Sequence, residues 1–179
     1  HVEVTYTLQG QKVVLQENVI VRAIRDSLMQ ILTGYEVYYV PDDLNLKGSI
    51  QWVKVNMEGA RTTEFLCLDI HANAHSNKQV RGVEVFTLNR DNSNAQKFAQ
   101  RLGESLGTKW KALPDTQSWV GQLGWCRQLL NAWVVECGYL TNSEDRLYLQ
   151  TPNQVAQAIK NAIDELYQVK VQTSQPSTY

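Results

Sequence analysis

The stretch Val134-Val135-Glu136-Cys137-Gly138-Tyr139-Leu140-Thr141-Asn142 decides how this chain folds, because it places one acidic residue inside an apolar run. A short run of this kind, rich in residues that favour strands and stopping at Thr-Asn, is typical of a buried strand in an α/β sheet. A carboxylate in such a run costs free energy unless a metal, a proton or a hydrogen bond compensates it. Glu136 therefore marks either an active site at the carboxyl end of a strand or an acid that points into solvent.

Around this strand, helical and strand-like patterns alternate along the chain. Residues 1–15 alternate polar and apolar side chains around Gln9-Gly10, which predicts a hairpin. We predict further strands at 35–40, 65–70 and 82–88, and helices at 17–32, 46–57 and 95–106, in a short segment before Glu136, and from Thr151-Pro152 onward. Such an order predicts βαβ crossovers, and therefore a three-layer α/β fold in which a mostly parallel sheet carries helices on both faces.

Composition indicates one globular domain. The chain has 179 residues, of which 43% are hydrophobic and 20% charged, and its formal net charge is −1. This balance argues against nucleic acid or an anionic membrane as a partner. No apolar run approaches the ~20 residues that span a bilayer, and no signal peptide is visible. The three cysteines (Cys67, Cys126 and Cys137) lack metal-type spacing and are expected to be free core residues.

The three histidines bear on metal chemistry. His71 follows a short apolar strand, at the position where α/β enzymes place functional groups. One imidazole, a second imidazole and a carboxylate are a ligand set of catalytic zinc sites, which leave a fourth position open. Taken alone, His71 also fits a loop residue bonded to backbone. Glu17 equally fits an acid that a helix favours in its first turn.

Four motifs, in order, resemble those of the zinc-dependent N-acetylmuramoyl-L-alanine amidases, the amidase type 3 family. Phe65-Leu-Cys-Leu-Asp-Ile-His-Ala-Asn-Ala74 is similar to that family's strand and "SIHANA" motif, and Gly82-Val-Glu-Val-Phe86 to its following strand. The segment 131–145 is close to its "PavLvEcGFlTN…ED" signature, and Glu17-Asn-Val-Ile-Val21 to its "E-K-D-x-N-L" helix start. The resemblance covers nearly the whole chain and implies a phosphorylase/hydrolase-like fold.

The resemblance implies a role for each matching residue. His71 and Glu17 become zinc ligands, and Glu136 becomes the general base and acid. The remaining ligand of the family is a histidine about as far before the glutamate ligand as His1 lies before Glu17, so His1 is the expected third ligand, although no strand or glycine flanks it here. His75, four residues after His71, is the alternative.

Further residues are assigned to the substrate. The resemblance places Asn73 and Arg127 in substrate binding, with a surface salt bridge as the other interpretation of Arg127. Three tryptophans (Trp110, Trp119 and Trp125) either stack on substrate or pack in the core. The chain departs from the family at Asp69, where the family has serine, and at Asn131, where it has proline.

The implied activity is hydrolysis of the amide between N-acetylmuramic acid and L-alanine in peptidoglycan. Zinc would lower the pKa of its bound water towards ~7, and Glu136 would take the proton of that water and deliver it to the leaving amine. We expect residues 1–168 to form this zinc amidase domain and 169–179 a polar tail or linker. We expect a monomer that binds neither nucleic acid nor membrane and acts on the cell wall, as a secreted or periplasmic autolysin or a phage endolysin released from the host cytoplasm.

Three other functions stay open at this point. A zinc peptidase acting on the stem peptide would use the same metal chemistry. A glycosidase would use two carboxylates such as Glu84 and Glu136, and would not need a metal. A non-catalytic wall-binding homologue would bind peptidoglycan without zinc-dependent turnover.

Overall fold

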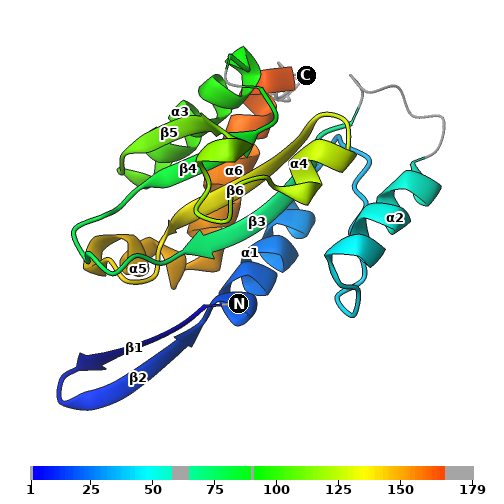
Figure 1. The fold of residues 1–179 in the computed structure, drawn as a ribbon. Helices are drawn as coiled ribbons and strands as arrows, with labels where there is room; N and C mark the ends of the chain where they lie inside the picture. The colour runs from blue at the N-terminus through cyan, green and yellow to red at the C-terminus, as the bar shows by residue number, and fades with distance from the viewer. Residues whose placement is uncertain (1, 58–64, 90, 168–179) are drawn as a thin grey trace, which may run out of the picture.

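The computed structural model describes residues 2–57, 65–89 and 91–167 (Figure 1). The elements of these segments are β1 (Glu3–Leu8), β2 (Gln11–Gln16), α1 (Glu17–Ile31), α2 (Leu46–Asn56), β3 (Cys67–Asn73), β4 (Val83–Thr87), α3 (Ser93–Leu106), β5 (Trp110–Pro114), a 3₁₀ turn (Asp115–Gln117), α4 (Gly124–Gln128), β6 (Ala132–Tyr139), α5 (Ser143–Leu149) and α6 (Pro152–Tyr167). None of the helices in these segments is long and apolar enough to cross a membrane. The predicted polar tail, 169–179, lies outside them.

The central sheet has four strands in the order β3-β6-β4-β5. β3 pairs with β6 in parallel and β4 with β5 in parallel, whereas β4 and β6 are antiparallel. β6 lies between β3 and β4, parallel to the first and antiparallel to the second, so β4 runs opposite to β3. The predicted α/β fold is confirmed, with a mixed sheet in which two of the three strand pairs are parallel.

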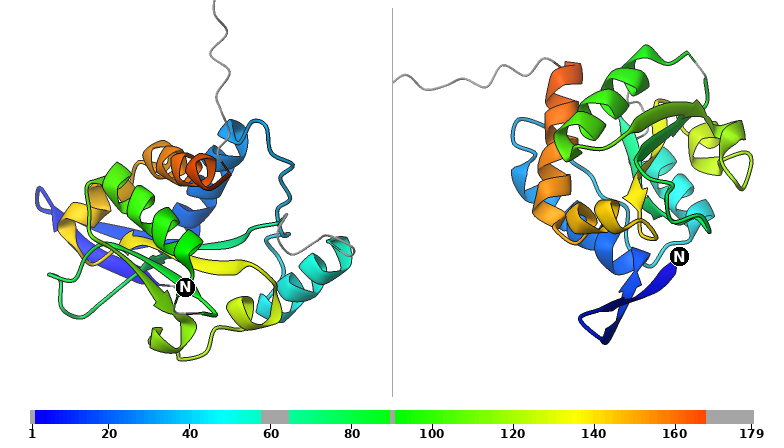
Figure 2. Two further views of the ribbon diagram at one scale, coloured as in Figure 1. Left: turned by 90° about the horizontal axis from the view of Figure 1, so that it is seen from above. Right: turned by 90° about the vertical axis from the view of Figure 1, so that its left-hand side faces the viewer.

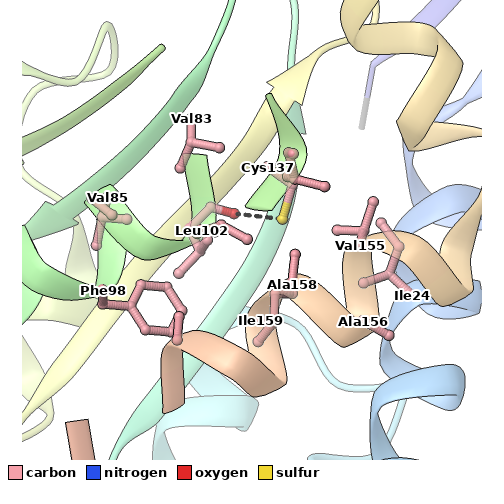
Figure 3. Close-up of a cluster of buried hydrophobic side chains, with 14 of the residues drawn as sticks. Ile24, Val83, Val85, Phe98, Leu102, Cys137, Val155, Ala156, Ala158 and Ile159 are labelled. Atoms are coloured by element: carbon pink, nitrogen blue, oxygen red, sulfur yellow. Dashed lines mark hydrogen bonds between the residues drawn. The ribbon is translucent and has the colours of Figure 1, made fainter. Parts of the chain in front are cut away.

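Helices cover both faces of this sheet, as Figure 2 shows from above. α1, α3 and α6 pack on one face, and α2 and α4 lie over the other. The first face carries the larger core, in which Val83 and Val85 of β4 and Cys137 of β6 meet Phe98 of α3 and Ile159 of α6 (Figure 3). The second cluster is smaller and includes Val134 and Phe86.

Alternation along β6 decides which face Glu136 occupies. Trp133, Val135 and Cys137 enter the larger core, while Ala132 and Val134 enter the smaller one. Because side chains of a strand alternate between faces, Glu136 belongs to the face that α2 and α4 cover. These two helices leave part of that face open, and the acid lies in the open part.

Local sequence signals account for most element boundaries. The Asn92 side chain accepts a hydrogen bond from Ala95 N at the start of α3, and Gly107 ends that helix with φ +65°. The β1–β2 hairpin turns at Gln9 (φ +49°) and Gly10 (φ +80°), a pair of left-handed residues that suits a two-residue turn. The three cysteines are free, as expected.

Three local predictions were wrong. Residues 35–40 form no strand, because the apolar side chains of Val37, Tyr38 and Tyr39 are exposed rather than buried in a sheet. β5 was missed, because its exposed residues Trp110 and Lys111 hide the alternation of a buried strand. α5 was missed as well, although Asn142 caps it by accepting from Glu144 N and Asp145 N.

Candidate active site

His71 lies within β3, two residues before its end, and not in a loop as the sequence suggested. Its imidazole sits between two carboxylates: Nδ1 is 2.8 Å from Glu17 Oε1, and Nε2 is 3.2 Å from Asp69 Oδ2. Burial disfavours the imidazolium, but the hydrogen bonds to Asp69 and Glu17 outweigh burial and raise the pKa of His71 to about 11. The two acids beside this ring therefore favour its protonated form.

Glu17 is the first residue of α1 and is only 5% exposed. Its second carboxylate oxygen, Oε2, accepts a hydrogen bond of 2.8 Å from Val2 N, and its own backbone amide donates to Val2 O at 2.9 Å. Burial alone would raise the pKa of this carboxyl group. The hydrogen bonds from His71 and Val2 N outweigh burial, so the pKa is lowered and the group stays ionised.

Glu136, on β6, is the register partner of His71 on the parallel strand β3 and of Glu84 on the antiparallel strand β4. Paired residues of neighbouring strands project on the same face, so the three side chains form a row across the sheet. Glu136 Oε2 is buried and has no hydrogen-bond partner among the described residues. Burial raises the pKa of Glu136 to about 7; the positive His71 opposes this rise, and the negative Glu17 and Glu84 add to it.

A bulge in β6 directly follows Glu136. His71 pairs with Glu136 and Asn73 pairs with Tyr139, so β6 contains one more residue than β3 between these two pairs. Gly138 takes up this extra residue with φ +153°. Beyond it, the fully buried Asp145 accepts hydrogen bonds from Tyr139 N and from Gly82 N, which joins the end of β6 to the start of β4. The bulge and the Asp145 hydrogen bonds together fix the backbone that follows Glu136.

The row faces an open cleft with a volume of about 1450 Å³. Sites for small molecules measure roughly 300–1,000 Å³, so the cleft is large enough for part of a polymer. It is lined by Glu17, His71 and Glu136, and also by the 35–45 segment, α2 and the loop that carries Trp119. Asn73, predicted to bind substrate, also lines the cleft.

Arg127 is not among the residues that line this cleft. Its guanidinium donates to the buried Asp115 carboxylate, at 2.5 Å from Nε and 3.0 Å from the second terminal nitrogen. Asp115 also accepts from Leu123 N at 3.1 Å. Of the two interpretations of Arg127, the ion pair is the one seen here, and it clamps the two ends of the loop 115–123.

The other histidines contribute differently. His75 is exposed, and its Nδ1 accepts a hydrogen bond from Asn77 N at 3.0 Å within a local turn. His1 lies outside the described residues; its neighbour in sequence, Val2, is bonded to Glu17. Among residues 2–57, 65–89 and 91–167, no three His, Cys, Asp or Glu side chains gather into a group that could hold a metal. This part of the chain contains two of the three implied ligands, Glu17 and His71.

Sequence reasoning did not foresee two neighbours of the site. Asp69 was noted only as a departure from the family pattern, although its position two residues before His71 in a strand puts both side chains on one face. Glu84 was considered only for a glycosidase; it is 14% exposed and lies 3.6 Å from Lys111 Nζ. The antiparallel pairing of β4 with β6 brings it beside Glu136, and nothing in the local sequence indicates that pairing.

In one open cleft, the mixed α/β sheet carries a histidine and a half-buried glutamate whose Oε2 has no hydrogen-bond partner among the described residues. The sequence profile of N-acetylmuramoyl-L-alanine amidases matches residues 7–165. The chain belongs to this family, as the motifs indicated, and is thus a peptidoglycan amidase of the cell wall.

Solved structures show the same fold. The catalytic domain of CwlV, an N-acetylmuramoyl-L-alanine amidase from Bacillus (Paenibacillus) polymyxa var. colistinus, is 21% identical, with a TM-score of 0.67 and 86% of each chain covered. AmiC2 of Nostoc punctiforme is 20% identical, with a TM-score of 0.63 over 90% of this chain and 87% of that one. An N-acetylmuramoyl-L-alanine amidase from Clostridium difficile 630 is 17% identical, with a TM-score of 0.65 over 87% and 86%. No curated protein sequence matches the chain.

Proposed function

We propose that this amidase cleaves the bond between N-acetylmuramic acid and L-alanine by a zinc-dependent reaction in which Glu136 is the general base. The observation that carries the proposal is the position of Glu136 in an open cleft, next to His71: its buried Oε2 has no hydrogen-bond partner in the described part of the chain. A buried carboxylate oxygen without a partner costs free energy, and a reacting water or a substrate proton would supply the missing contact.

The donor set beside it fits zinc. Glu17 and His71 bring one carboxylate and one imidazole within 2.8 Å of each other, and His1 is the third ligand that the family resemblance implies. When bound, zinc would polarise the amide carbonyl and lower the pKa of bound water. Glu17 would enter this role already ionised and fixed by Val2, so little ordering would be needed.

Glu136 would move the protons of the reaction. It would accept a proton from the attacking water and then donate it to the nitrogen of the leaving L-alanine. A group that must do both works best when its pKa lies near the working pH, and the pKa of Glu136 is about 7. Burial is the largest cause of this raised pKa, and the negative charges of Glu17 and Glu84 add to it.

The cleft suits a polymer more than a small molecule. Of the three tryptophans considered for stacking, Trp125 is 7% exposed and packs in the smaller core, and Trp110 is exposed on β5 but does not line the cleft. Trp119 is 89% exposed and lines it. We assign Trp119 to contact with the peptidoglycan strand, because an aromatic ring offers large contact area at little cost in conformational entropy.

The deciding experiment combines zinc content with product analysis for the wild type, His71→Ala and Glu136→Ala. We expect His71→Ala to lose metal, and Glu136→Ala to keep metal but lose turnover. Amidase action releases free L-alanine amino termini and intact glycan strands. A stem peptidase would shorten the peptide, and a glycosidase would create new reducing ends and survive chelation. If Glu136→Ala cleaves as fast as the wild type, Glu136 is not the base.

A further inference from the structure

The His71 imidazole is contacted by a carboxylate at each ring nitrogen, and the two carboxylates differ in their surroundings. Glu17, at Nδ1, has a 7% exposed side chain and a second bond to Val2 N. Asp69, at Nε2, has a 33% exposed side chain. Within the described residues, His71 is the one basic side chain within 4.0 Å of Asp69.

We propose that Asp69 is a positioning residue: it holds the His71 Nε2–H and so presents Nδ1, together with Glu17 Oε1, to the zinc ion. This inference rests on the proposed zinc-dependent function. A neutral imidazole has one N–H and one lone pair, so a proton kept at Nε2 leaves the lone pair at Nδ1. Nδ1 is also the nitrogen that lies 2.8 Å from Glu17, so it is the one that can share an ion with that carboxylate.

The strand geometry places both side chains on one face. Asp69 and His71 are alternate residues of β3, so both side chains leave the same face of the strand, and β3 is held along its length by its pairing with β6. A histidine that binds a metal usually donates its other ring N–H to a carboxylate, a backbone carbonyl or water, which orients the ring and raises its basicity. An acid at position 69 supplies that partner from the same strand.

Asp69 also distinguishes this chain from the family pattern, which has serine at the position. A bond from a ring N–H to an ionised acceptor is roughly twice as strong as one to a neutral acceptor. The carboxylate would therefore hold the ring more firmly than a hydroxyl. It would also bring a further negative charge, beside Glu17, Glu136 and Glu84, to a site that binds a dication.

The first test measures zinc affinity directly. The protein is stripped of metal, and zinc is titrated in competition with a chromogenic chelator, for the wild type, Asp69→Asn, Asp69→Ser and Asp69→Ala. We expect affinity to fall by about 10–100-fold in the alanine variant. The zinc affinities of Asp69→Asn and Asp69→Ser should lie between those of the wild type and Asp69→Ala, because both side chains keep a hydrogen-bond acceptor. Glu84→Gln is the matched control for the loss of one charge on the same face, and it should weaken binding less than any Asp69 variant.

The second measurement does not depend on a variant folding. Nitrogen-15 NMR of the zinc-loaded wild type reads which ring nitrogen of His71 carries hydrogen and which binds the ion. We expect a protonated Nε2 and a metal-bound Nδ1. Metal on Nε2, or an alanine variant that binds zinc as tightly as the wild type, would overturn the assignment. If the wild type itself binds no zinc, the proposed function fails first and this inference fails with it.

Discussion

Gly138 and Tyr148 lie so close together that a Cβ on Gly138 would be 2.3 Å from the Tyr148 Oη. Gly138 also has φ +153°, which side chains of L residues rarely adopt. These two facts explain the glycine two residues after Glu136. A glycine here allows β6 to contain one more residue than β3 without displacing α5. Glu136 therefore pairs with His71, and Tyr139 pairs with Asn73.

Gly138→Ala should therefore damage both stability and turnover. Backbone strain and the clash together should cost about 2 kcal/mol or more of unfolding free energy, measured by urea denaturation. Cleavage of peptidoglycan should fall because the end of β6 shifts. Gly34→Ala is the matched control: Gly34 has φ +86° but open space around its Cα, so strain acts there without a clash. Equal losses in the two variants would mean that Tyr148 does not matter.

The buried acid predicts a pH-dependent gain from Glu136→Gln in the metal-free protein. The folded-state pKa of Glu136, about 7, lies above its ordinary value of 4.5, so the folded chain binds the proton more tightly than the unfolded chain. Below pH 4.5 both states are protonated and the variant should match the wild type. As pH rises from 4.5 through 7 the wild type loses stability, by about 3 kcal/mol at most, whereas the glutamine variant does not.

Thermal unfolding of the metal-free proteins between pH 4 and 8.5 checks this prediction. Glu104→Gln, which removes an exposed carboxylate from α3, is the control. A constant difference between Glu136→Gln and the wild type at every pH would contradict a raised pKa at Glu136.

Zinc binding should release protons. The pKa of His71 is raised to about 11 in the metal-free protein, so its ring is charged at neutral pH and must lose a proton before it can bind a metal. Zinc affinity should therefore rise with pH, and calorimetry in buffers of different ionisation enthalpy should detect about one proton released per ion. A chelator should abolish cleavage, and added zinc should restore it. Affinity that is independent of pH between 6.5 and 8.5 would exclude His71 as a ligand.

Arg127→Ala separates the two interpretations of that residue. Its removal would leave the 1% exposed Asp115 carboxylate without its cation, and loss of one partner of a buried pair costs about 3 kcal/mol. Chemical denaturation measures this loss, and Asp115→Asn combined with Arg127→Ala should cost less than the sum of the two single changes. If Arg127 instead serves the substrate, the variant will unfold like the wild type and lose only turnover.

Trp119→Ala tests the exposed aromatic ring that lines the cleft. Loss of the exposed ring should raise KM for polymeric peptidoglycan by about tenfold, which corresponds to about 1.4 kcal/mol, and leave kcat unchanged. Leu147→Ala removes another highly exposed apolar side chain, one that does not line the cleft, and should change neither constant. A fall in kcat with unchanged KM would place Trp119 in the chemistry instead of in binding.

Much of the fold could be predicted because its signals are local. The stripe through Ile24 and Leu28 of α1, and the Asn92 and Gly107 caps of α3, depend on neighbours within one or two turns. Residues 35–40 could not be judged in this way. Tyr38 and Tyr39 have strand propensity, but a strand also needs a partner, and whether one is available depends on the rest of the fold.

The α/β class, the family and the importance of Glu136 and His71 could be predicted from the residues alone, because hydrophobic period, capping residues and motif spacing are properties of the chain. Three contacts could not be predicted before the fold was known: Asp69 and Glu17 lie at opposite nitrogens of one imidazole, Glu84 flanks Glu136, and Arg127 is held by Asp115. These contacts depend on strand order and direction, which bring together residues as far apart as Glu17 and His71. The pKa values of His71 and Glu136 follow from that assembly, because burial and neighbouring carboxylates shift them.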